Sequence, residues 1–355
     1  MSVIKNDRLL RVLNHQPVDR VPVWMMRQAG RTDPEYNQLK KNDGRSLEKL
    51  FADPEISIKI SLLPKRLGVD AIIMFQDILT PLTPAGAGFH FAPGPILEKP
   101  VRTMSQVKAL RAFDPEVELQ SVAKILKGLN AELEGELPVL GFAGSPMSLA
   151  FFMIAGRSPN QKLAEVLAFI EEQAEITQAL LEWLTVMTVD YLNFQIASGA
   201  QAVQLFESFA DVIPLEIYKR FVQPTHEKIF SALSTSAPSI LFTKESAHLD
   251  LMLQSGASVL SVGNCIDLED AQKQAPEMIF QGNVDNKILA DGTKAEITQA
   301  VQKCFEQSGR KNHILNLNHG LLAHTPFENV QHFVNVAKEL GRIEGVPHED
   351  VHPKN

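Results

Sequence analysis

Two arginines, Arg27 and Arg31, stand four residues apart in the segment PVWMMRQAGRTDPEY, directly after an apolar run. A guanidinium group binds a carboxylate or phosphate through two parallel hydrogen bonds. Gly30, between the two arginines, permits close backbone approach and unusual dihedral angles. Neighbouring arginines are commonly partners in surface ion pairs, but a position at the end of an apolar strand favours a clamp for an anionic ligand.

Asp77 and His319 are two further residues that suit chemistry. Asp77 ends the run AIIMFQD, so its carboxylate is expected to be partly buried and to need a partner. It would serve either in a structural pair with an arginine or as an acid, a base or an acceptor of substrate N–H groups. His319, in LNLNHG, would project from a strand end or be a satisfied structural histidine, and the sequence leaves both open.

The composition argues against several function classes. The chain has 355 residues with a formal net charge of −8, which is unfavourable for a nucleic-acid-binding protein. Local cations must therefore meet any anionic substrate. The sequence has no P-loop, no G-x-G-x-x-G, no G-x-S-x-G and no C-x-x-C pattern, and we expect neither a metal nor a nucleotide cofactor.

The location of the protein is predicted from the same data. The two cysteines, Cys265 and Cys304, form no disulfide framework, which indicates a reducing compartment. The first 20 residues lack the apolar centre of a signal peptide. Because no apolar run reaches the roughly 18 residues of a membrane span, we expect a cytoplasmic protein without a membrane segment.

Short apolar runs that end in polar or small residues recur along the chain and predict strands, with helical patterns between them. Such alternation indicates parallel pairing through crossover helices. Eight units favour a closed (β/α)8 barrel formed by one domain, residues 1–355, over an open doubly wound sheet. The eight runs are 21–28, 71–77, 138–145, 202–208, 239–245, 258–264, 278–285 and 313–320.

The barrel would bring the polar residues that end these runs together, because active sites in this fold lie at the carboxyl ends of the strands. A Pro/Gly-rich section, 80–103, is too long for a simple connection and is expected to pass over the mouth as a wall or lid. The tail, 345–355, is polar. The residues expected to converge are Arg27, Arg31, Asp77, Ser145, Ser208, Lys244, Asn264, Asn283, Asp285 and His319.

The opening motif PVWMMRQAGRTDPEY closely resembles the N-terminal signature of the uroporphyrinogen decarboxylase family. Five further segments resemble motifs of that family in the same order: AIIMFQDILTPL, PVLGFAGSPMSLAFFMIAG, VQLFESFA, QGNVD and HILNLNHGL. The resemblance spans nearly the whole chain. It implies a (β/α)8 barrel, a homodimer and a cofactor-free enzyme that converts uroporphyrinogen III to coproporphyrinogen III by releasing four acetate carboxyl groups as CO2.

The same resemblance implies roles for individual residues. Asp77 would hold the pyrrole N–H groups and stabilise a cationic intermediate, and Arg27 and Arg31 would take part in catalysis. The segment Arg27, Gln28, Ala29, Gly30 and Arg31, together with Ser208 and His319, would bind substrate carboxylates, while Phe142, Phe152 and Phe206 would line the cavity.

Several residues depart from the family pattern, and they cluster at the expected mouth. Phe152 stands where tyrosine is common, Gln76 where serine is common, and Asn318 where the pattern N-L-G-H-G has glycine. Gly263 and Asn264 align with Asp-Trp. These departures leave two alternatives: a paralogue that binds tetrapyrroles without decarboxylating them, and a corrinoid-dependent methyltransferase relative, although the chain lacks the H-x-C pair of the latter.

Overall fold

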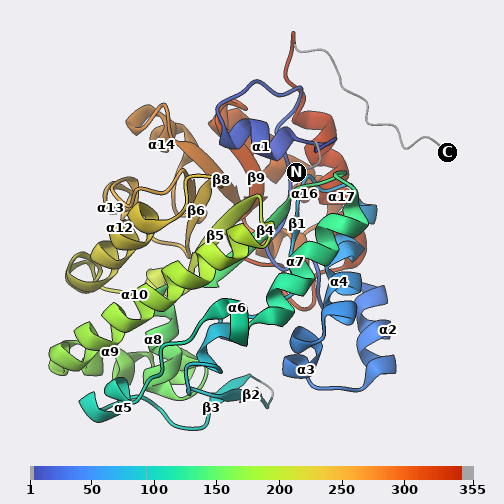
Figure 1. The fold of residues 1–355 in the computed structure, drawn as a ribbon. Helices are drawn as coiled ribbons and strands as arrows, with labels where there is room; N and C mark the ends of the chain where they lie inside the picture. Colours follow the sequence, from blue (N-terminus) through green and yellow to red (C-terminus); the bar gives the residue numbers. More distant parts are fainter. Residues whose placement is uncertain (1–3, 93, 346–355) are drawn as a thin grey trace.

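The computed structural model describes residues 4–92 and 94–345. At its centre is a curled parallel sheet of seven strands in the order β1-β4-β5-β6-β7-β8-β9, with the helices around it (Figure 1). Each neighbouring pair runs parallel, so successive strands are joined by crossover segments. The strands are β1 Ile72–Ile73, β4 Val139–Gly144, β5 Ala202–Glu207, β6 Ser239–Thr243, β7 Val259–Ser261, β8 Ile279–Val284 and β9 His313–Leu317.

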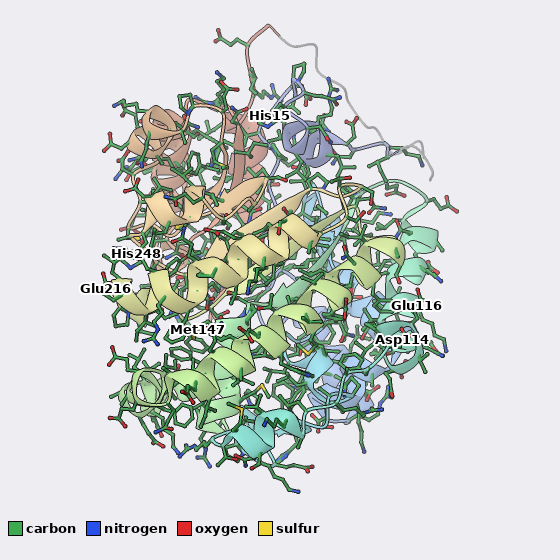
Figure 2. The ribbon with its side chains drawn as sticks, turned by 60° about the vertical axis from the view of Figure 1, so that its left-hand side comes forward. His15, Asp114, Glu116, Met147, Glu216 and His248 are labelled. Atoms are coloured by element: carbon green, nitrogen blue, oxygen red, sulfur yellow. The ribbon has the colours of Figure 1, made fainter. Side chains whose placement is uncertain are left out.

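The helices cover the outside of this sheet, and side chains fill the space between the helices and the strands (Figure 2). Helices lie between the strands, as the sequence predicts, and two of them lie between residues 160 and 198. The helices are α1 Arg8–Leu13, α2 Pro34–Asp43, α3 Leu47–Ala52, α4 Pro54–Leu62, α5 Met104–Lys108, α6 Pro115–Glu118, α7 Gln120–Leu133, α8 Pro146–Ala155, α9 Leu163–Glu172, α10 Ala174–Ala197, α11 Leu215–Ile217, α12 Gln223–Ala232, α13 Leu249–Leu253, α14 Leu268–Gln274, α15 Asn286–Asp291, α16 Lys294–Ser308 and α17 Phe327–Leu340.

Seven of the eight expected strands are formed, and the first run, 21–28, is the exception. It makes a single parallel bridge, between Val23 and Leu315 of β9. On its other side the Val23 carbonyl accepts the Asp70 N–H at 2.8 Å, but the Val23 N–H donates to the Asp70 carboxylate at 2.7 Å. Pro22 has no N–H to donate. A side chain and a proline thus interrupt the ladder that a regular strand would need.

A series of buried side-chain hydrogen bonds shows that the sheet is curled. The indole N–H of Trp24 donates to the Gln281 Oε1 at 2.9 Å, and the Gln281 Nε2 donates to Gln204 and Ser261, each at 2.9 Å. Gln204 lies on β5 and Gln281 on β8, which are not neighbours in the sheet. Such side chains meet only across the concave side of a curled sheet. The segment before Arg27 is therefore tied to β8 through Trp24.

Asp70 holds this first segment in place. Its carboxylate is fully buried and accepts two hydrogen bonds from Arg20, at 2.6 and 2.7 Å, besides that of Val23. Replacing Asp70 with Ala is expected to lower the free energy of unfolding by about 3–5 kcal/mol, because a buried Arg20 then loses its partner. Urea denaturation followed by circular dichroism would measure it. The exposed pair of Lys59 and Glu55 is the matched control, and its removal should change little.

The section 80–103 contains a 3-10 helix, η2 (Thr80–Leu82), and an antiparallel hairpin of β2 (Phe89–Phe91) and β3 (Pro95–Leu97). The hairpin is attached to the end of α8, because the Leu97 N–H donates to the Gly156 carbonyl at 2.9 Å.

The polar tail lies outside the described residues from position 346 on. It includes HEDVH at 348–352, which has H-E-x-x-H spacing, and the expectation that this chain binds no metal overlooks it and remains an untested prediction. No described helix is long and apolar enough to cross a membrane.

Candidate active site

The turn after Met26 presents the two arginines. The residue of this turn with a left-handed backbone conformation is Arg27, whose φ is 61°. The sequence predicts that Gly30 would have it. Gln28 supports this turn: its Oε1 accepts the Met25 N–H at 3.0 Å, and its Nε2 donates to the Ala71 carbonyl at 2.9 Å. The Gln28 side chain is 2% exposed, so it holds the turn while the arginine side chains remain free to project.

The guanidinium groups of Arg27 and Arg31 have no ion-pair or hydrogen-bond partner within the described part of the chain. Other arginines do: Arg20 pairs with Asp70, and Arg66 with Asp33. Arg27 is exposed to solvent yet closely surrounded by protein atoms, as in a concave mouth. Burial, then Arg31, lowers the pKa of Arg27, and Asp77 opposes this. Two unpaired cations so close together give this turn a local positive charge that attracts anions.

Gly320 joins this turn to the end of β9. A Cβ atom placed on Gly320 would lie 2.5 Å from the Arg27 Cδ, so only glycine leaves room for the arginine stem. The Leu321 N–H also donates to the Met26 carbonyl at 3.1 Å. The structure therefore brings Arg27 to His319, the residue before Gly320, across nearly the full length of the sequence.

Asp77 follows β1 with one carboxylate oxygen engaged and the other unused. Its Oδ1 accepts the Leu79 N–H at 2.8 Å, whereas its Oδ2 accepts no hydrogen bond from any residue that the structure describes. Burial raises the pKa of Asp77 to about 6, against the opposing effects of the Leu79 N–H and Arg27. Near neutral pH this group is a poorly hydrated carboxylate, suited to accept N–H groups or to face a cation.

Aromatic rings connect the strands at this end of the sheet. Phe142 and Phe206 meet edge to face with ring centroids 5.6 Å apart, Phe206 and Phe242 are 5.4 Å apart, and Phe242 reaches His319 at 5.6 Å. Phe206 is only partly buried. Burial, then Arg27 and Lys244, lowers the pKa of His319 to about 3, so the imidazole is neutral in the free protein. These rings form an apolar wall beside the charged groups.

Ser208 is positioned by a buried cluster that the sequence does not reveal. Its N–H donates to the Ser148 Oγ at 2.7 Å, and Ser148 donates to the Glu207 Oε1 at 2.6 Å. Glu207 also accepts from the Ser145 Oγ at 2.5 Å and lies 3.4 Å from the His226 Nε2. Sequence reasoning missed Glu207 because a glutamate in LFES gives no signal of full burial. Ser145, expected at the mouth, instead supports this cluster.

Phe152 lies apart from the ring chain. It packs edge to face on Phe209, with centroids 5.5 Å apart, and Phe209 stacks on Phe151 at 5.0 Å. Phe152 is on α8 and only partly buried. Its contact with Phe209, the residue after Ser208, places it near the end of β5, although no ring contact joins it to Phe142 or Phe206 among the described residues.

Comparison with known proteins identifies the family. The model of the family described as "Uroporphyrinogen decarboxylase (URO-D)" matches residues 4–340. A uroporphyrinogen decarboxylase from Trichlorobacter lovleyi is 38% identical over 95% of this chain and 99% of its own, and one from Geobacter metallireducens is 36% identical over the same shares. The chain belongs to the uroporphyrinogen decarboxylase family. A methyltransferase from Methanosarcina mazei superposes with a TM-score of 0.75 over 95% of this chain and 99% of its own; at 18% identity this likeness concerns the fold alone.

Two departures from the decarboxylase pattern share one partner, Glu245. The Asn318 Nδ2 donates to the Glu245 Oε1 at 2.7 Å, and the Asn318 Oδ1 accepts the Asn286 N–H at 2.8 Å. A Cβ atom on Gly263 would lie 2.6 Å from the Glu245 Oε2, so glycine makes room for that carboxylate. The Cys265 N–H donates to it at 3.1 Å. Asn318 and Gly263 both differ from the decarboxylase pattern, and both accommodate the same carboxylate, that of Glu245. Their contacts with it connect the loops after β6, β7 and β9.

Gln76, a further departure, is likewise engaged within the protein: its Nε2 donates to the Phe51 carbonyl at 2.6 Å, and its Oε1 accepts from the Thr80 hydroxyl at 3.2 Å. These bonds hold the segment around Asp77 against α3. Asn318, Gly263 and Gln76 therefore build local supports around Asp77 and the loops at the strand ends.

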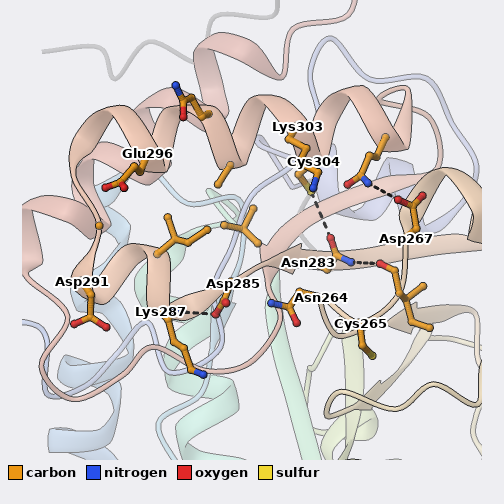
Figure 3. Close-up of a pocket in the computed structure, with 17 residues that line it drawn as sticks. Asn264, Cys265, Asp267, Asn283, Asp285, Lys287, Asp291, Glu296, Lys303 and Cys304 are labelled. Atoms are coloured by element: carbon orange, nitrogen blue, oxygen red, sulfur yellow. Dashed lines mark hydrogen bonds between the residues drawn. The ribbon is translucent and has the colours of Figure 1, made fainter.

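A separate pocket of about 830 Å³ lies between the ends of β7 and β8 and the helices α15 and α16 (Figure 3). Arg27, Asp77 and His319 do not line it. Its charged side chains include four carboxylates, from Asp267, Asp285, Asp291 and Glu296, against two lysines, Lys287 and Lys303. An excess of negative charge does not suit a polyanionic substrate. Three residues that were expected at the mouth line this outer pocket instead: Asn264, Asn283 and Asp285.

Proposed function

We propose that this chain is a cofactor-free uroporphyrinogen decarboxylase that converts the four acetate side chains of uroporphyrinogen III to methyl groups, giving coproporphyrinogen III and four CO2. One observation carries the proposal: Arg27, unpaired within the described part of the chain, lies within electrostatic reach both of Arg31 and of a carboxylate, Asp77, whose second oxygen is unused. The substrate supplies what each lacks, because its carboxylates pair with the guanidinium groups and its pyrrole N–H groups donate to Asp77.

The chemistry follows from these groups. Loss of CO2 from an arylacetate leaves an unstable carbanion, but a proton added first to a pyrrole ring carbon makes that ring an electron sink. The C–C bond to the carboxylate then breaks, its electron pair flows into the ring, and CO2 departs. A proton on the exocyclic carbon and loss of the ring proton complete the methyl group. The Asp77 carboxylate stabilises the cationic intermediates, because a fixed charge in a poorly hydrated site acts strongly on them.

The remaining residues bind and orient the substrate in this proposal. Arg27 and Arg31 hold carboxylates, with the backbone of Gln28, Ala29 and Gly30 shaping the turn between them. Ser208 and neutral His319 donate hydrogen bonds to other carboxylates. Phe142, Phe206 and Phe152 form the apolar wall, which excludes water from the reacting ring.

We further propose that the segment 21–28 closes the sheet into a complete barrel within a single domain, with 80–103 as one wall of its mouth. The bridge of Val23 to β9 and its bonds to Asp70 support closure. The attachment of the hairpin to α8, the helix of Phe152, supports the wall. By family resemblance we infer that the protein is cytoplasmic and forms a homodimer. Analytical ultracentrifugation would test the homodimer.

An anaerobic assay with uroporphyrinogen III tests the function, with products counted by their carboxyl groups after oxidation. Steady formation of the tetracarboxylic product would support the decarboxylase. Tight binding without CO2 release would favour the tetrapyrrole-binding paralogue. That alternative is motivated by Phe152, which lacks the hydroxyl of the tyrosine common at this position. Accumulation of the heptacarboxylic product would show that the altered mouth impairs rebinding of the first intermediate.

The activity is expected to fall as the pH drops through about 6. Burial raises the pKa of Asp77 to about 6, so protonation below that value removes the charge that faces the intermediate. Measuring kcat/KM from pH 5 to 8.5 should give an acidic limb of unit slope, about tenfold per pH unit. The Asp77→Asn variant should lose this limb, and its persistence in that variant would assign the limb to another group.

A further inference from the structure

The register of β5 and β6 places Lys244 beside Ser208. Phe206 pairs with Phe242 and Glu207 with Thr243, and the Lys244 N–H donates to the Glu207 carbonyl at 3.1 Å, so the parallel pairing continues one residue past β6. In a strand, residues two apart share a face. Ser208 and Lys244 therefore follow Phe206 and Phe242 on one face.

That face is the one that carries the candidate site. The rings of Phe206 and Phe242 are in contact, and Phe242 meets the His319 ring. The intervening residues, Glu207 and Thr243, are fully buried and bond instead to α8 and α13, through Ser148 and Met252. Lys244 thus stands at the mouth with His319, and its charge acts with that of Arg27 to lower the pKa of His319.

Lys244 has a partner that a ligand could replace. Its Nζ lies 2.8 Å from the Asp211 Oδ2, and the two side chains remain 35% and 25% exposed. Ion pairs this open to solvent contribute little stability. Asp211 lies in η4 (Ala210–Val212), three residues after Ser208, so the pair spans the loops that follow β5 and β6. Among the described residues, the Lys244 ammonium group is therefore paired with one carboxylate, that of Asp211, which is itself partly open to solvent.

We propose that Lys244 is the third cation that binds substrate carboxylates at this site, beside Arg27 and Arg31, and that Asp211 holds its ammonium group until a substrate carboxylate takes its place. The inference rests on the proposed function, since uroporphyrinogen III carries eight carboxylates. Lysine suits the role because its ammonium is a mobile point charge on a flexible stem, whereas the arginines bind in a fixed fork. The exchange conserves charge pairing around Lys244 before and after binding.

The two partners then have opposite effects on ligand affinity, which a structural ion pair would not show. Lys244→Met should weaken binding roughly tenfold, because one charge-assisted hydrogen bond is lost. Asp211→Asn should tighten binding severalfold, because it removes the competing carboxylate. Lys244→Arg should retain most of the affinity. The probe is uroporphyrin III, the oxidised octacarboxylate, titrated by fluorescence quenching, with the KM for uroporphyrinogen III measured alongside.

Lys219→Met is the matched control, because Lys219 pairs with Glu216 at 3.4 Å and Glu216 lies at the outer edge of the molecule (Figure 2). Equal weakening by Lys244→Met and Asp211→Asn would overturn the inference, as would a Lys244→Met variant that binds like Lys219→Met. The titration needs no turnover, so the two proposals can fail separately. If the wild-type chain releases no CO2 but the two variants still change uroporphyrin III affinity in opposite directions, the proposed function is rejected and the role of Lys244 is supported.

Discussion

Replacing Asp77 with asparagine is expected to lower kcat about a thousandfold, the scale on which one fixed electrostatic group acts in a preorganised site. Asparagine has the same shape, and its oxygen would still accept the Leu79 N–H that holds Asp77 now. What is lost is the negative charge that faces the cationic intermediate. The anaerobic assay with uroporphyrinogen III, read by carboxyl count over time, measures the effect.

The same variant should remain fully folded. Burial raises the pKa of Asp77 to about 6, above its ordinary value. The folded state therefore holds protons on this group more tightly than the unfolded chain does, and its relative stability declines as the pH rises through the interval up to about 6. Removing the charge should leave the urea midpoint at pH 7.5 equal or higher.

Asp291→Asn is a suitable control, since Asp291 is an exposed acid on the outer pocket, 3.3 Å from His324. It should keep full activity. An Asp77→Asn variant that turns over at the wild-type rate would remove Asp77 from the proposed mechanism. A variant that is inactive because it has unfolded would contradict the reading that the Asp77 charge is a cost to stability.

Much of the fold is predictable from the sequence because parallel strands buried on both faces appear as continuous apolar runs. β4 is such a run, and every one of its residues is buried. β8 and β9 are buried throughout as well, although polar residues interrupt their apolar runs. The run at 21–28 looks the same, yet it forms only a bridge. The reason is the carboxylate of Asp70, which takes the Val23 N–H, and no local pattern announces a side chain that replaces a backbone partner.

The candidate site was predictable to the extent that it follows strand ends. Arg27, Asp77 and His319 were each expected from their place after an apolar run, and the structure brings Asp77 and His319 each within electrostatic reach of Arg27. Their supports depend on contacts between distant segments. The left-handed backbone of Arg27, the burial of Glu207 and the bond of Asn318 to Glu245 have no counterpart in local spacing.

The neutral state of His319 changes how its role is understood. A histidine close to Arg27 and Lys244 would add a further cation only if it were protonated, but burial lowers its pKa to about 3. It therefore offers a neutral N–H donor, and the positive charge of the mouth comes from Arg27, Arg31 and Lys244. In the proposed function, carboxylate recognition therefore depends on these three cations in a chain whose net charge is −8.

For this reason, Arg27→Met is expected to reduce kcat/KM about a hundredfold, mostly through a higher KM. A charge-assisted hydrogen bond contributes about 1.5–3 kcal/mol, and a bidentate guanidinium makes two, so even partial loss reaches this size. Methionine keeps much of the stem that packs against Gly320, which limits any change in fold. Steady-state kinetics with uroporphyrinogen III would separate KM from kcat.

Arg27→Lys decides between charge and geometry as the origin of the effect. Lysine preserves the positive charge but not the planar fork, so it should recover only part of the loss if carboxylate binding is bidentate. Arg45→Met is the control, because Arg45 is already paired with Asp43 and Asp53 on the surface and should leave KM unchanged. Full recovery by lysine would mean that Arg27 acts as a point charge, and the two unpaired guanidiniums would then be interchangeable cations rather than an oriented clamp.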